Sequence, residues 1–192
     1  MVRQRMTSLI YYLPGWAGHL STGLGRALID RGFDVTGRET RGDFKDLSFT
    51  DQVETVKEDL LKHFWTEDSR VIANSFGAYL FLHAQASLES YPGKVLLLSP
   101  IVGGFADEET GRFFSPPQEH RLLKLAEAGQ FPVPKNCEVH TGSEDWQSHP
   151  VAVTKFFGLL GVDAVVAAGR GHSLGEDYVS PLLDSWLSSS II

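Results

Sequence analysis

Short apolar segments alternate with longer amphipathic ones along this chain, and this alternation constrains the fold more than any other feature. The apolar segments are expected to form strands, at residues 9–13, 33–36, 70–74, 94–99, 137–140 and 163–167. The amphipathic segments are expected to form helices, at residues 21–31, 51–65, 76–87, 151–160 and 178–187. Strands of this kind belong to parallel sheets that helices cover on both faces. We therefore expect an α/β protein, a three-layer α/β/α sandwich with a mainly parallel sheet of about six strands.

The length of the chain suits one domain. It has 192 residues, of which 42% are hydrophobic and 21% are charged, which is enough for a substantial core but not for two ordinary domains. We expect a single domain over residues 1–192. Its one long connection, residues 101–136, contains four prolines and an expected helix over 118–128. Connections of this length are more often functional than idle, so this segment is a candidate lid-like insertion.

Charge and cysteine content exclude several classes of protein. The net charge of -7 argues against a nucleic-acid partner and against an anionic membrane surface. Residues 9–13 are too short for the core of a signal peptide, and no apolar run is long enough to span a bilayer. The only cysteine, Cys137, rules out an internal disulfide and is interpreted as a packed strand residue rather than a nucleophile. We expect a cytoplasmic protein that acts on a small molecule, and its oligomeric state stays open.

A serine stands at a turn between an expected strand and an expected helix. The sequence there is Ala73-Asn74-Ser75-Phe76-Gly77. A tight strand-to-helix turn lifts the serine oxygen clear of the sheet, and it needs small residues two positions before and after the serine. Ala73 and Gly77 meet that need. Ser75 is therefore a candidate nucleophile, and an ordinary helix N-cap is the alternative.

Further along the chain, an acidic residue and a histidine lie in two glycine-containing loops, each of which follows an expected strand. Asp145 and Glu144 follow the strand at 137–140, and His172 follows the strand at 163–167. A serine hydroxyl needs a base to remove its proton, and the base works best when a carboxylate orients it. We expect His172 to be the base and Asp145 the acid, with Glu144 as the alternative acid.

The loop after the first strand, Leu13-Pro14-Gly15-Trp16, is a candidate oxyanion loop. A tetrahedral intermediate needs two preset N–H donors, for which we expect the amides of Trp16 and Phe76. The loop matches neither glycine-rich phosphate-binding pattern. Nearby aromatic and polar side chains are candidate substrate contacts, with core packing as the alternative. The candidate substrate contacts are Trp146, His19 and Phe113.

The order of oxyanion loop, serine turn, acid loop and histidine loop resembles that of the α/β-hydrolase superfamily, in particular its small single-domain serine esterase-like members. The resemblance implies that Ser75, Asp145 and His172 form a triad and that Trp16 and Phe76 supply the oxyanion donors. Ala73 replaces a glycine common in the family. We expect a serine hydrolase that cleaves a carboxylic ester or thioester through an acyl-enzyme, with no metal or other cofactor. Peptidase or lyase chemistry on the same triad, or a non-catalytic binding protein, are the alternatives.

Overall fold

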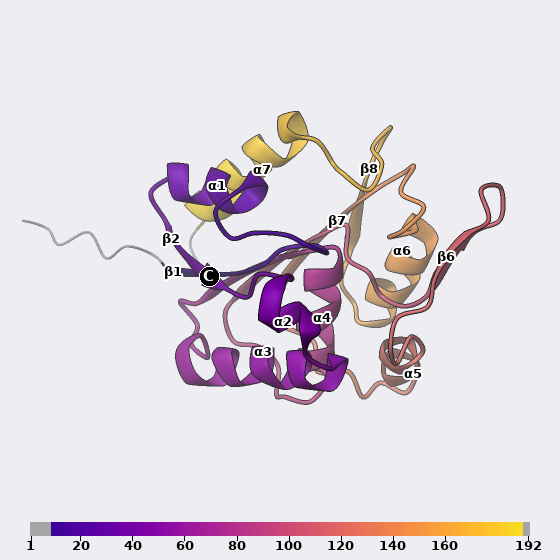
Figure 1. Cartoon of the computed structure of the whole chain (residues 1–192), viewed down its shortest axis with the longest axis horizontal. Coiled ribbons are helices and arrows are strands. Elements are labelled where there is room, and N and C mark those ends of the chain that lie inside the picture. The colour runs from indigo at the N-terminus through magenta and orange to yellow at the C-terminus, as the bar shows by residue number, and fades with distance from the viewer. Residues whose placement is uncertain (1–8, 190–192) are drawn as a thin grey trace, which may run out of the picture.

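The computed structural model describes residues 9–189, and its centre is a six-stranded sheet (Figure 1). Every neighbouring pair of strands runs parallel, in the order β2-β1-β3-β4-β7-β8. This arrangement confirms the predicted α/β class and the predicted sheet. The strands are β1 (Leu9–Leu13), β2 (Asp34–Gly37), β3 (Arg70–Asn74), β4 (Lys94–Leu98), β7 (Asn136–Gly142) and β8 (Ala164–Ala167).

Helices cover both faces of the sheet. Helices α1 (Gly23–Asp30) and α7 (Glu176–Ser188) lie together on one face, and the other face carries α3 (Phe49–His63), α4 (Phe76–Gln85) and α6 (Pro150–Leu159). Two shorter helices are α2 (Gly42–Asp46) and α5 (Arg121–Glu127). Within residues 9–189, no helix has both the length and the apolar character needed to cross a membrane.

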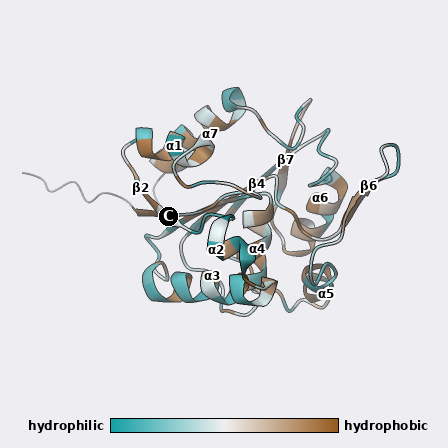
Figure 2. Cartoon of the chain, in the orientation of Figure 1, coloured by the Kyte–Doolittle hydropathy of each residue, from teal (hydrophilic) through white to brown (hydrophobic). Residues whose placement is uncertain are grey.

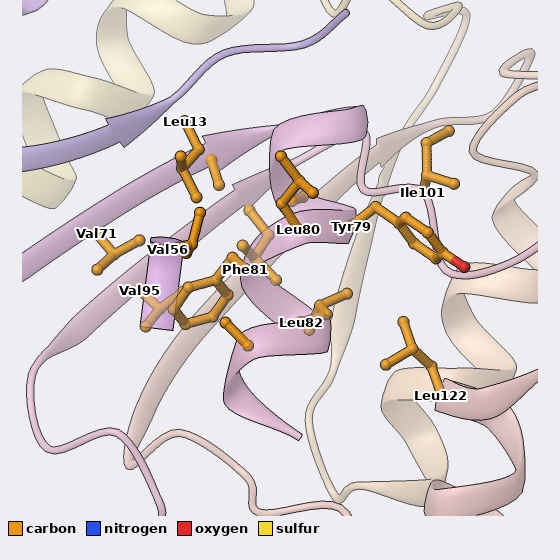
Figure 3. Packing of buried hydrophobic residues seen from close by; sticks show 14 of the residues in the cluster. Leu13, Val56, Val71, Tyr79, Leu80, Phe81, Leu82, Val95, Ile101 and Leu122 are labelled. Atoms are coloured by element: carbon orange, nitrogen blue, oxygen red, sulfur yellow. The ribbon is translucent and has the colours of Figure 1, made fainter. Parts of the chain in front are cut away.

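The strands divide their side chains between two cores. Because successive residues of a strand point to opposite faces, Tyr11 and Leu13 pack toward α3 and α4, whereas Ile10 and Tyr12 pack toward α1 and α7. Figure 3 shows the first of these cores, in which Leu80, Phe81 and Leu82 of α4 meet the sheet and its other helices. Figure 2 shows the hydrophobic residues concentrated in the sheet and the hydrophilic ones along α3.

The start of α3 differs from its prediction. The helix begins at Phe49 rather than at Asp51, and its N-cap is Ser48. The Ser48 hydroxyl oxygen accepts the N–H of Asp51 at 3.1 Å, which satisfies one of the unpaired amides at the helix start. The apolar periodicity could not locate this start, because the first turn has few buried residues.

The connection at 101–136 contains a hairpin that the sequence did not predict. Strands β5 (Phe105–Asp107) and β6 (Arg112–Phe114) are antiparallel, and the hairpin projects from the body of the molecule (Figure 1). The expected helix at 118–128 is the shorter α5. The connection is tied to α4, since the Tyr79 hydroxyl donates to the carbonyl of Pro117 at 2.7 Å and Arg121 donates to the carbonyl of His83 at 3.2 Å.

Candidate active site

Ser75 lies at a strained turn between β3 and α4. Its backbone has φ 52° and ψ -120°, a region that L-residues rarely adopt. Although Ser75 occupies the N-cap position of α4, its side chain makes no capping hydrogen bond. Its Oγ lies instead 2.8 Å from Nε2 of His172. The hydroxyl is thus directed at an imidazole, which is the geometry of a nucleophile and its base rather than that of a cap.

Glycines make this turn possible. A Cβ added at Gly77 would lie 2.1 Å from the carbonyl oxygen of Leu13 and 2.4 Å from that of Pro14. Only glycine therefore lets the start of α4 pass so close to the end of β1. At Gly15, an added Cβ would lie 3.2 Å from Cβ of Ser75. The loop after β1 is consequently held directly against the serine.

Asp145 is the carboxylate that contacts the histidine. Both of its carboxylate oxygens lie 3.0 Å from Nδ1 of His172, and its residue surface is 1% exposed. Its Oδ1 also accepts the backbone N–H groups of Gln147 and Ser148, at 2.9 and 2.8 Å. Glu144, the alternative acid, is exposed. The two backbone donors hold the Asp145 carboxylate in one orientation, which in turn fixes the imidazole.

The acid loop and the histidine loop are bonded to each other. The N–H of Ser143 donates to the carbonyl of Ala167 at 2.9 Å, and the N–H of Glu144 donates to that of Arg170 at 2.8 Å. A Cβ at Gly142 would lie 2.1 Å from the Arg170 carbonyl oxygen, so a larger residue would separate the loops. The two loops therefore present Asp145 and the imidazole as one preformed unit.

The predicted oxyanion donors lie beside the serine. Trp16 follows Gly15, and its ring meets the ring of Phe76 edge-on, with centroids 5.2 Å apart. Within residues 9–189, neither the backbone N–H of Trp16 nor that of Phe76 donates to another protein group. Both amides are thus available as hydrogen-bond donors, and their assignment to an oxyanion hole is still a prediction.

A cavity of about 800 Å³ opens at Ser75 and His172 and extends between α1 and α7. The sequence did not reveal it. Periodicity identified Leu24 and Ala27 as the inward face of a helix, but it gave no sign that this face borders empty space. Three polar residues around the serine, Asn74, Ser99 and Gln147, also line the cavity. Its apolar wall is formed by Leu24, Ala27, Leu98, Leu174, Val179 and Leu183.

The three candidate substrate contacts, Trp146, His19 and Phe113, do not line this cavity. Nδ1 of His19 lies 3.6 Å from Oε1 of Glu39. The Trp146 ring turns toward the hairpin and packs edge-on against Phe105, with centroids 5.4 Å apart. Phe113 is 79% exposed on the hairpin and borders a separate cavity of about 470 Å³. The role of these three residues as substrate contacts is therefore still a prediction, and the sequence did not indicate that apolar residues of α1 and α7 line the cavity.

The other candidate features lie apart from the cavity. None of residues 101–136, all of which the structure describes, lines it, so the proposed lid role is still a prediction. Cys137 lies half-buried in β7, and burial raises the pKa of its thiol to about 12. A thiol of that kind is a poor nucleophile. In residues 9–189, no three His, Cys, Asp or Glu side chains form a group that could hold a metal ion.

Comparison with known proteins shows which solved structures have a similar fold. No family model matches the chain, and no curated protein matches its sequence. The solved structures that it resembles include the ydeN gene product from B. subtilis, at 14% identity and a TM-score of 0.63 over 95% of this chain and 100% of that one. Est1E from Butyrivibrio proteoclasticus is 15% identical, with a TM-score of 0.62 over 94% of this chain and 86% of that one.

TT1662 from Thermus thermophilus is 18% identical to this chain, with a TM-score of 0.63 over 96% of it and 90% of that protein. Several similar structures carry hydrolase or esterase titles. Together with the parallel sheet and its element order, these similarities show that the chain has the α/β-hydrolase fold.

Proposed function

We propose that this protein is a serine hydrolase that cleaves a carboxylic ester or thioester of a small molecule through an acyl-enzyme on Ser75. The observation that carries the proposal is the hydrogen-bonded series from Ser75 Oγ to His172 Nε2, at 2.8 Å, and from His172 Nδ1 to the Asp145 carboxylate, at 3.0 Å. Additional support comes from similarly folded proteins whose titles name esterases, namely esterase PE8 and a structure from a study of carboxylesterases of Nitrososphaera gargenis.

The first half of the reaction forms the acyl-enzyme. Ser75 Oγ attacks the carbonyl carbon of the substrate while its proton passes to Nε2 of His172. Asp145 holds the imidazole in the tautomer that accepts this proton and stabilises the imidazolium. The amides of Trp16 and Phe76 donate to the oxyanion. His172 then gives its proton to the leaving alkoxide or thiolate as the carbon–oxygen or carbon–sulfur bond breaks.

The second half releases the acid. Water enters the site vacated by the leaving group. His172 removes a proton from this water molecule while the water oxygen attacks the acyl carbon. Collapse of the second tetrahedral intermediate breaks the bond to Oγ, and the imidazolium returns its proton to Ser75. The cycle consumes one water and restores the free enzyme.

A fluorophosphonate probe tests the nucleophile directly. The native protein is expected to be labelled at Ser75 and to hydrolyse p-nitrophenyl acetate. Ser75→Ala should abolish both labelling and turnover, whereas Cys137→Ala, the matched control for the other potential nucleophile, should retain both. Labelling that persists in Ser75→Ala contradicts the proposal. Faster cleavage of a p-nitroanilide than of the matching p-nitrophenyl ester favours a peptidase instead.

A further inference from the structure

We propose that the cavity of about 800 Å³ between α1 and α7, from here on called the groove, binds the linear apolar acyl chain of the substrate. In this proposal Arg31 closes the end of the groove that is farthest from Ser75 and so limits the length of the acyl chain. This inference rests on the proposed function, because the groove opens at the serine that would carry the acyl group. It names the part of the substrate that the enzyme recognises, which the catalytic triad alone does not define.

The walls of the groove suit a hydrocarbon chain. Leu24 and Ala27 are three residues apart on α1, and Val179 and Leu183 are four residues apart on α7, so each pair lines one face of its helix. Leu98 of β4 is buried at the base. Each methylene group buried against such a surface strengthens binding about fourfold.

The far end of the groove is closed by one side chain. From the C-cap position of α1, Arg31 donates to Asp184 at 2.7 Å and to the hydroxyl of Ser180 at 2.7 Å, and both of those residues belong to α7. It also donates to the carbonyl of Ala27 at 2.9 Å. The guanidinium therefore joins the two helices at the C-terminal end of α1. That end lies away from Ser75, because α1 runs back from the carboxyl end of β1 to the start of the parallel strand β2.

The bonds of Arg31 also exclude a charged substrate group at this end. Its charge is already paired with the Asp184 carboxylate, and the other cation along the groove, Arg26, is paired with Asp30 at 2.8 Å. A substrate carboxylate would have to displace one of these partners. An uncharged chain terminus fits without such competition.

The length of the groove follows from the helix. Leu24 and Arg31 are seven residues apart, which corresponds to roughly 10 Å along a helix axis. An extended chain of intermediate length fills that distance, whereas a longer one meets the guanidinium.

The closed end also favours the acyl group over the alcohol as occupant. The alcohol or thiol must leave before water attacks, whereas the acyl group stays on Ser75 through both halves of the reaction. A groove that ends blindly at Arg31 suits the group that is retained.

The inference is tested with p-nitrophenyl esters whose acyl chains run from acetyl to palmitoyl. The kcat/KM of the native protein is expected to rise about fourfold with each methylene until the groove is filled, and then to fall. Arg31→Ala should move the maximum to longer chains. Ala27→Leu narrows the groove and should move it to shorter ones. Lys57→Ala, which removes a cation from a surface pair with Glu54 on the opposite face of the sheet, should leave the profile unchanged.

A second measurement separates this inference from the proposed function and does not depend on turnover. The rate at which alkyl fluorophosphonates label Ser75 should show the same dependence on chain length and the same shifts in Arg31→Ala and Ala27→Leu. Labelling without any dependence on chain length overturns the groove assignment and leaves the serine hydrolase intact. Absence of labelling at Ser75 contradicts the function itself. If Arg31→Ala does not fold, Ala27→Leu still decides, because an unshifted profile in that variant overturns the inference.

Discussion

The two faces of the sheet are covered to different degrees. On one face, α3, α4 and α6 pack against the sheet, and every residue of α4 from Phe76 to Gln85 is buried. On the other face, α1 and α7 cover the sheet, and between them lies the cavity of about 800 Å³ that opens at Ser75. One face therefore supplies stability, and the other supplies room for a ligand.

The contrast explains how the strained backbone of Ser75 is held in place. Ser75 begins α4, the most deeply buried helix, so its unusual backbone conformation is imposed by the closely packed face. Its hydroxyl borders the cavity of the open face. Rigidity and access thus come from opposite sides of the same sheet, and substitutions on each side are expected to have different consequences.

The largest expected effect is loss of the base on the open face. His172→Ala leaves Ser75 without a proton acceptor and should lower kcat for ester hydrolysis by about six orders of magnitude. The His172 side chain is partly exposed, so thermal unfolding should change little. Steady-state kinetics and a melting curve check both points. A decrease of tenfold or less would show that another group acts as the base.

Asp145→Asn is expected to have the next largest effect. The side-chain amide would keep its contacts with the backbone but would no longer hold the imidazole of His172 in the tautomer that accepts the serine proton. The kcat should therefore fall about 10⁴-fold. Glu144→Gln is the matched control, because it removes an adjacent exposed carboxylate and should retain wild-type kcat. Equal losses in the two variants would contradict the assignment of Asp145 as the acid.

A pair of truncations compares the two faces directly. Phe81→Ala removes a fully buried ring from the packed face and should lower the free energy of unfolding by about 4 kcal/mol, without changing the acyl-chain preference of the folded protein. Leu183→Ala enlarges a cavity that already exists, so its cost should be nearer 2 kcal/mol, and the preference should move to longer chains. Chemical denaturation and ester kinetics provide the two measurements. A shifted preference in Phe81→Ala would remove the distinction between the faces.

The packed face should also make stability depend on pH. Burial, aided by the Arg121 guanidinium, lowers the pKa of His83 to about 3, whereas an unfolded histidine titrates near 6.5. Because the folded pKa is the lower one, the unfolded state binds more protons as the pH falls below about 6.5, and stability is lost in that direction. Between pH 7 and pH 5 the loss from His83 should be about 2 kcal/mol.

His83→Phe keeps an aromatic ring between Phe49 and Tyr79 but cannot be protonated. Denaturation midpoints at the two pH values should therefore differ less in this variant than in the native protein. An identical pH dependence in both proteins would show that His83 does not control it.

The contrast between the faces also marks what could be predicted from the sequence. The contact among Ser75, Asp145 and His172 could be predicted because each follows a strand in a parallel sheet, and the carboxyl ends of such strands meet at one edge. The cavity could not be predicted from the sequence. Hydrophobic periodicity shows which face of a helix points inward, but it does not show whether that face meets another side chain or an empty space. The hairpin strands at Phe105–Asp107 and Arg112–Phe114 were missed because each has only three residues, too few for a recognisable alternation.

The smallest expected effect concerns a hydrogen bond beside the serine. The Tyr12 hydroxyl donates to Oδ1 of Asn74 at 2.9 Å, and burial raises the pKa of Tyr12, so this hydroxyl stays protonated at neutral pH. Asn74 lines the cavity, and its amide is oriented by this bond. Tyr12→Phe should cost about 1 kcal/mol of stability and lower kcat/KM about fivefold, because Asn74 can then rotate toward the substrate.

Tyr91→Phe is the matched control on the packed face, where the Tyr91 hydroxyl donates to the carbonyl of Phe64 at 2.8 Å. It should cost a similar amount of stability but leave kcat/KM unchanged, since no residue near Ser75 depends on that bond. Unfolding curves and ester kinetics on the two variants separate a general loss of stability from a local effect on the site. If both variants lowered kcat/KM equally, the orientation of Asn74 would not matter for the reaction, and the packed face would influence catalysis as strongly as the open one.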